Sequence, residues 1–251
     1  MAQQKGIIPL KGTIGNITFY KSQDGYLARE KGSLDAQRIA NDPAFARTRE
    51  NGAEFGRAGK AGKLLRSSIR SLLLNTADSR MISRLTREMM KVIQADAVNE
   101  RGQRNVLDGE TELLQGFEFN ANSKLGTVFF APFTQSLNRT SGVLDIVIPP
   151  FVPAIMIAAP SGATHYKLVS AGVELNFETE QFTAALSNQT AAVIDSTPTA
   201  ALTLTHTVTA NSTRPLMLVL GIEFYQEVNG QLYSLKNGAF NALAVVAVSG
   251  Q

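Results

Sequence analysis

The side chains that most often carry out catalysis are few in this sequence, and they lie far apart. Histidine occurs only twice, as His165 and His206, and neither has a carboxylate within four residues. The spacing therefore does not indicate a histidine metal site or a triad-like cluster. His206 alternates with Leu204 and Val208, which predicts a histidine buried on the apolar face of a strand.

The carboxylates and glycines give no clearer site. Glu178 and Glu180 lie in a predicted turn, where carboxylates are usually exposed, and the acidic stretch 108–112 lacks the spacing of a calcium loop. The chain has no cysteine, which excludes disulfides and thiolate chemistry. No Gly-Lys-Ser/Thr ending follows the glycines of 52–62, so a phosphate loop is not indicated. We expect no enzymatic activity, no metal site and no cofactor.

Charge is distributed unevenly along the 251 residues. Residues 1–104 hold 19 Lys and Arg against 10 Asp and Glu, a net charge of +9, and residues 105–251 hold 5 against 11, a net charge of −6. This difference predicts two modules, 1–104 and 105–251. The basic side chains that we expect to contact either nucleic acid or a docking protein are Lys11, Lys21, Arg29, Lys31, Arg49, Arg57, Lys60, Lys63 and Arg70.

These side chains need elements to position them, and the first is a glycine-flanked hairpin. Residues 17–20 and 26–29 have the composition of strands, and Ser22-Gln-Asp-Gly25 is a good turn between them. Two strands alone are marginally stable in water. We therefore expect the hairpin to lie against its own helices, a neighbouring subunit or a nucleic-acid backbone.

A long helix is expected to follow, with Asp42 as its N-cap and Pro43 at its first position. The helical pattern continues to about residue 70, and one arc collects Ala44, Phe55, Ala58, Leu65 and Ile69. Glycines inside a helix are costly, so Gly52, Gly56, Gly59 and Gly62 predict either close packing against another backbone, with the first three as the main candidates, or a flexible basic loop.

A second helix is expected between residues 77 and 96. Its apolar side chains recur at three- and four-residue spacing, as Ile82, Leu85, Met89, Val92 and Ile93.

The second module has the pattern of an antiparallel β-domain. Short apolar or alternating runs separated by turn residues predict strands at 117–120, 127–130, 144–148, 166–177, 182–186, 201–208, 216–225, 231–235 and 242–248. Asn229-Gly230 predicts a two-residue hairpin turn between two of them. The expected fold is α+β: a basic N-terminal hairpin and two helices, followed by an antiparallel β-sandwich of jelly-roll or Ig-like type.

Part of the first module resembles a known family. The segments GTIGNITFYKSQDGYLAREK and DPAFARTRENGAEFGRAGK are similar to an uncharacterised bacterial and prophage-associated family, in which a glycine-flanked hairpin precedes a Gln/Arg-rich helix. The family has no established function, so the resemblance implies no site residues. It implies an accessory or structural protein of a bacterium or its viruses.

The sequence shows no signal-peptide pattern and no apolar run long enough to span a membrane. We expect a cytoplasmic protein or a component of an assembled particle.

Three functions remain open at this point. The first is a structural subunit whose β-sandwich self-associates into a homo-oligomer and whose basic arm docks on a neighbour. The second is a DNA- or RNA-binding protein that uses the basic module. The third is a β-sandwich that binds carbohydrate or another ligand, although the chain has no tryptophan for sugar stacking.

Overall fold

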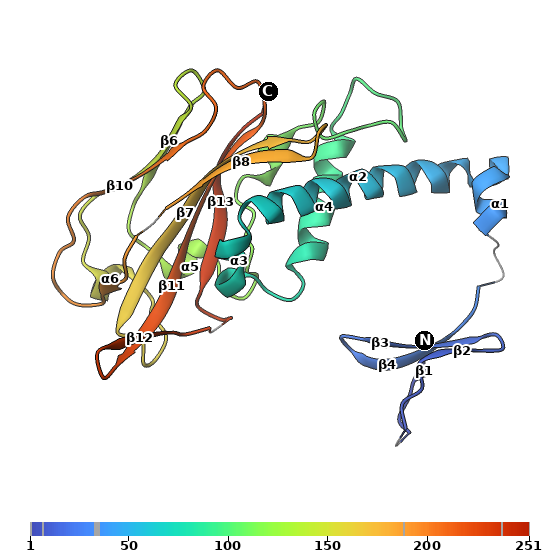
Figure 1. Cartoon of the computed structure of the whole chain (residues 1–251), viewed down its shortest axis with the longest axis horizontal. Coiled ribbons are helices and arrows are strands. Elements are labelled where there is room, and N and C mark those ends of the chain that lie inside the picture. Colours follow the sequence, from blue (N-terminus) through green and yellow to red (C-terminus); the bar gives the residue numbers. More distant parts are fainter. Residues whose placement is uncertain (1, 7, 33–35, 188, 237, 251) are drawn as a thin grey trace. The chain divides into compact units, whose positions relative to one another are not determined.

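A computed structural model describes residues 2–6, 8–32, 36–187, 189–236 and 238–250. It contains helices and antiparallel sheets, as expected for an α+β chain. The chain divides into two compact units, Met1–Arg49 and Glu50–Gln251 (Figure 1). We call the first unit the arm and the second unit the body. The boundary expected at residue 104 falls inside the body.

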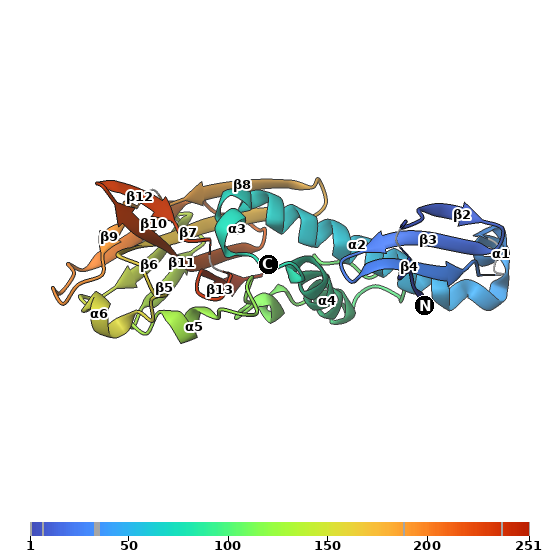
Figure 2. The ribbon, with the colours of Figure 1, turned by 90° about the horizontal axis from the view of Figure 1, so that it is seen from below.

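The arm is built on a four-stranded antiparallel sheet. Its strands are β1 (Ala2–Gln3), β2 (Gly12–Ile14), β3 (Ile17–Ser22) and β4 (Gly25–Glu30), in the order β1-β4-β3-β2. Figure 2 shows β4, β3 and β2 side by side. Gly25 has a φ of 107°, the positive value that the β3–β4 turn needs. Helix α1 (Ala36–Asn41) and a 3-10 turn (Pro43–Phe45) follow, and the side chain of Asp42 accepts a hydrogen bond from the Ala44 amide.

Three helices form one layer of the body. They are α2 (Ala46–Ser68), α3 (Arg70–Thr76) and α4 (Met81–Gln94). Helix α2 runs without a break through Gly52, Gly56 and Gly59, so the flexible-loop interpretation of this segment is wrong. The buried faces carry Ala58, Leu65 and Ile69 before α3 and Leu85, Met89 and Ile93 in α4. Three residues expected on these faces are exposed instead: Ala44, Phe55 at 61% and Ile82 at 53%.

The central layer is a six-stranded sheet. Its strands are β7 (His165–Asn176), β8 (Gln181–Leu186), β9 (Ala192–Val193), β11 (Leu216–Val228), β12 (Gln231–Ser234) and β13 (Ala242–Ser249). The order β12-β11-β7-β8 is completed by β13, which pairs with β11, and by β9, which pairs with β7. Asn229 and Gly230 both have positive φ between β11 and β12, which confirms the predicted hairpin turn.

A three-stranded sheet of β5 (Thr134–Asn138), β6 (Val143–Ile148) and β10 (Leu202–Thr207) forms the third layer, in the order β10-β6-β5. The connections carry α5 (Leu125–Val128), α6 (Pro153–Met156) and a 3-10 turn (Thr111–Leu114). Residues 127–130 were expected to be a strand, but Thr127 and Val128 lie in the short helix α5.

The central sheet is therefore buried on both faces. One hydrophobic cluster joins Leu65, Leu85 and Met89 of the helices to Val173 and Val219 of the sheet. A second cluster lies between the other face and the small sheet, and it joins Leu144, Ile146 and Leu204 to Leu218 and Leu220 (Figure 1). Packing on both sides explains why β7 and β11 are buried along most of their length rather than at alternate residues.

Candidate docking surface on the arm

The arm has no buried side chain among its described residues, and this distinguishes it from the body. Hydrogen bonds hold its strands together instead. The Gln4 side chain accepts from the Leu10 amide at 2.8 Å and donates to the Leu27 carbonyl at 3.0 Å, while the Lys31 amide donates to the Asn16 carbonyl at 2.6 Å. A sheet of this size usually needs an apolar face packed against something else.

The pairing register separates the two faces of the arm sheet. Ile17 pairs with Glu30, Phe19 with Ala28 and Lys21 with Tyr26, and directly paired residues point to the same face. The pairs of β2 and β1 place further apolar side chains on that face. We call this surface the apolar face of the arm; it comprises Ala2, Ile14, Ile17, Phe19, Tyr26 and Ala28, with Lys21 and Glu30 at its ends.

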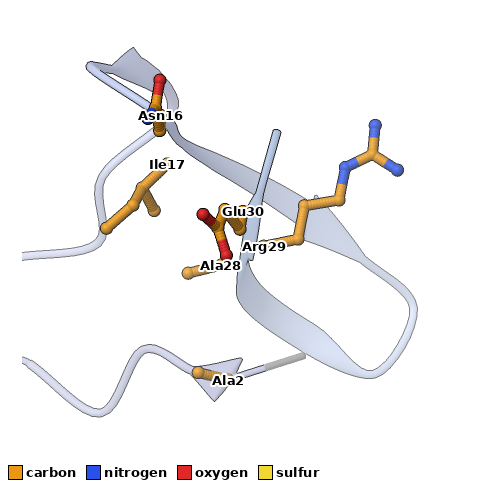
Figure 3. Close-up of a pocket in the computed structure, with 6 residues that line it drawn as sticks. All are labelled: Ala2, Asn16, Ile17, Ala28, Arg29 and Glu30. Carbon is orange, nitrogen blue, oxygen red and sulfur yellow. The ribbon is translucent and has the colours of Figure 1, made fainter. Parts of the chain in front are cut away.

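The apolar face is accessible in the structure. Ile14 is 63% exposed and Ile17 is 47% exposed. A hollow of about 540 Å³ opens beside Ala2, Ile17 and Ala28, and Asn16, Arg29 and Glu30 complete its lining (Figure 3). Large exposed aliphatic side chains around a hollow are a common feature of surfaces that meet a partner.

The opposite face of the arm sheet is mostly polar, although Leu27 and Tyr20 are paired at its centre. The hydroxyls of Thr13 and Thr18 lie 3.3 Å apart, and the guanidinium of Arg29 lies over the ring of Tyr20 at 5.6 Å. In Figure 3 the Arg29 side chain extends away from Ile17 and Ala28. The apolar face of the arm is thus suited to contact with a partner, and the opposite face is better suited to solvent.

The expected basic contacts are only partly available for a partner. Arg49 donates to the carbonyls of Ile39 and Asp42 at 2.8 and 2.9 Å, and Arg57 donates to those of Gly102 and Arg104 at 2.7 and 3.0 Å. Lys60 forms an ion pair with Glu180 at 3.2 Å. The remaining candidates are exposed and form no ion pair with another described residue: Lys11, Lys21, Arg29, Lys31, Lys63 and Arg70.

Most of the excess positive charge lies in the arm. Residues 1–49 hold 8 Lys and Arg against 4 Asp and Glu, a net charge of +4, so the remaining 202 residues carry −1 of the chain's +3. The negative charge of residues 105–251 is largely offset by the Lys and Arg residues of helices α2, α3 and α4, because these helices pack on the same core.

The three candidate glycines have no close neighbour in the chain. A Cβ added at Gly52, Gly56 or Gly59 would meet nothing within 4 Å. The glycine that approaches another helix is Gly62, where an added Cβ would lie 3.5 Å from Cγ of Leu85. The close packing expected at the first three therefore does not occur within the described chain, and it remains a prediction for a partner.

The body contains one serine–histidine pair that the sequence did not suggest. Ser170 Oγ lies 2.9 Å from Nε2 of His206, which is 1% exposed, and burial lowers the pKa of this histidine. Asp145 is paired with Thr205, so it points to the opposite face of the small sheet from His206. The pair is closed to solvent, and no carboxylate among the described residues hydrogen-bonds to the imidazole.

The described residues contain neither a metal-binding cluster nor a membrane-spanning helix. No three His, Asp or Glu side chains among them gather as a metal site would require. Each of their helices is too short or too polar to cross a membrane.

The pairing register of the arm strands is the feature that reveals the apolar face of the arm. Alternation of Ile17, Phe19 and Lys21 was visible in the sequence, but Glu30 and Ile14 join them only once the turns fix which residues pair.

Comparison of the chain with protein-family models, curated proteins and solved structures found no match.

Proposed function

We propose that this protein is a non-enzymatic structural subunit that assembles into a homo-oligomer or larger particle, with the arm docking on a neighbouring subunit. The observation that carries the proposal is the arm itself. It is a sheet with no buried side chain among its described residues and with one exposed apolar face. Burial of that face on a neighbour would supply the hydrophobic stabilisation that the arm lacks on its own.

The proposal also covers the fold type of the body and the kind of assembly to which the protein belongs. The body would act as an antiparallel sandwich, of jelly-roll or Ig-like type, that associates with other copies. The packing of β6 and β10 over β7 and β11 around one core supports a sandwich. The resemblance of residues 12–31 and 42–60 to a prophage-associated family supports a structural or accessory role.

Light scattering coupled to size-exclusion chromatography tests this function. The full chain at moderate salt should run as a defined oligomer or polymer. A variant lacking residues 1–40 should run as a monomer and keep the circular dichroism of the body, since both hydrophobic clusters consist of residues from 58 onward. A full chain that stays strictly monomeric at high concentration would contradict the proposal.

The concentration of charge in the arm favours nucleic-acid binding as the second candidate. Lys11, Lys21, Arg29 and Lys31 are exposed, and the arm carries a net charge of +4. If they contact phosphates, retention of DNA or RNA should fall steeply as salt rises, because each contact releases counterions. Retention that is absent at low salt would remove this candidate.

A further inference from the structure

The apolar face of the arm carries opposite charges at its two ends. Glu30 is paired with Ile17 at one end of β3, and Lys21 is paired with Tyr26 at the other. Between them lie Phe19 and Ala28, which are half-buried and carry no charge. The face thus has a positive end and a negative end separated by an apolar centre.

Among the described residues, no opposite charge lies within 4.0 Å of either charge. Neither Lys21 nor Glu30 forms an ion pair with a described residue; the Lys21 ammonium lies over the ring of Tyr26 at 5.5 Å. Four residue steps along a strand separate the two by about 14 Å. Exposed charges that far apart are largely screened from each other, because the Debye length is about 8 Å at physiological ionic strength.

We propose that the apolar face of the arm packs against the same face of a second copy about a two-fold axis, with Lys21 of each copy paired to Glu30 of the other. This inference rests on the proposed function and names the partner of the docking surface. An isologous contact requires a surface that complements itself. A face with opposite charges at its two ends meets that requirement, since one rotation creates two ion pairs.

The geometry of such a dimer follows from the register. A two-fold axis that lies between the sheets and exchanges Lys21 with Glu30 makes the two sets of strands cross at about 40°, from the usual strand spacing and rise. Sheets that pack face to face commonly cross at about 30°. The same rotation places Tyr26 of the second copy over the hollow beside Ala2, Ala28 and Glu30 (Figure 3).

The size of the face predicts how strong this contact is. Four short strands cover less than the roughly 1,200 Å² of buried surface that a stable interface usually needs. The arm-to-arm contact is accordingly weak alone, and assembly needs this contact and the contacts between bodies together.

Charge reversal in the full-length chain tests the pairing. Lys21→Glu and Glu30→Lys each turn both ion pairs into pairs of like charges, and each should weaken association in sedimentation equilibrium by at least about tenfold. The double variant K21E/E30K should restore association to near the wild-type value. Arg29→Glu is the matched control, because it makes the same charge change as Lys21→Glu on the opposite face and should leave association unchanged.

Mixing the two single variants is a second measurement that also shows that they fold. A copy with Lys21→Glu complements a copy with Glu30→Lys at both ion pairs, so the mixture should associate more strongly than either variant alone. Failure of both the double variant and the mixture to associate would overturn the arm-to-arm pairing. If the wild type assembles and all of these variants assemble equally well, the pairing is wrong while the proposed function stands. If the wild type is a monomer, both are wrong.

Discussion

At the scale of single residues, Asp96 shows how hydrogen bonds within the fold shift the pKa of a buried carboxyl group. Its carboxylate accepts hydrogen bonds from the amides of Val98, Asn99 and Asn105 at 2.8, 2.9 and 3.0 Å. Burial alone raises the pKa of Asp96, but the hydrogen bonds from Asn99, Asn105 and Val98 outweigh it and lower the pKa from 3.8 to about 2. The carboxylate therefore fastens the end of α4 to the loop that leads into the 3-10 turn.

This tuning predicts a specific dependence of stability on pH. The pKa is lower in the folded state than in the unfolded state, so the contribution of Asp96 is full above pH 4 and is lost as the pH falls towards 2. Asp96→Asn should lower the free energy of unfolding by about 2 kcal/mol at pH 7, and the difference from wild type should disappear near pH 2. Denaturant titrations at several pH values measure this.

The control for Asp96 is Glu100→Gln, because Glu100 is exposed and should change stability little. An Asp96→Asn variant as stable as the wild type at pH 7 would contradict the role of these hydrogen bonds.

At the scale of elements, two glycines predict opposite effects of the same substitution. A Cβ added at Gly172 in β7 would lie 2.6 Å from Cβ of His206 and 2.9 Å from Cδ1 of Leu144, so the two sheets approach closely only because this residue lacks a side chain. Gly172→Ala should destabilise the body by about 1–3 kcal/mol through overpacking. Gly56→Ala on the exposed face of α2 should stabilise it by about 1 kcal/mol.

Thermal unfolding of the two variants measures this contrast. The two shifts in unfolding temperature need not be equal in size. A stabilising Gly172→Ala substitution would contradict the close packing of the two sheets. A Gly56→Ala variant that is more stable but no longer assembles would place a partner on this face of α2.

Elements whose signals are local were predictable from the sequence. The Asn229-Gly230 turn and the Asp42 cap depend on a few adjacent residues, and both appear where the pattern indicated. Phe55 and Ile82 were misplaced because helical periodicity gives a direction but not the position of the neighbouring layer. The uses of Arg49 and Arg57 were not predictable either, because each depends on carbonyls whose positions follow from the tertiary fold.

At the scale of the whole molecule, the two units should differ in local stability. Strands β7 and β11 are buried from both sides, whereas the strands of the arm have no buried residue among those described. Amide hydrogens in β3 and β4 should therefore exchange much faster than those in β7 and β11 at concentrations where the protein is unassembled.

Hydrogen exchange followed by mass spectrometry over a concentration series measures this difference. Protection in β3 and β4 should rise with concentration as the apolar face is covered, while Arg29→Glu serves as a variant with the same fold and an altered polar face. Strong protection of β3 and β4 in a dilute monomer would show that the arm is stable without a partner.

Every member of the two hydrophobic clusters comes from residue 58 or later. Substitutions in the first 49 residues therefore leave those interiors untouched, and the two parts of the gene are free to diverge at different speeds. Evolution can transplant such a segment onto an unrelated carrier or replace it wholesale, and new assemblies would arise by recombination rather than by gradual redesign of a core.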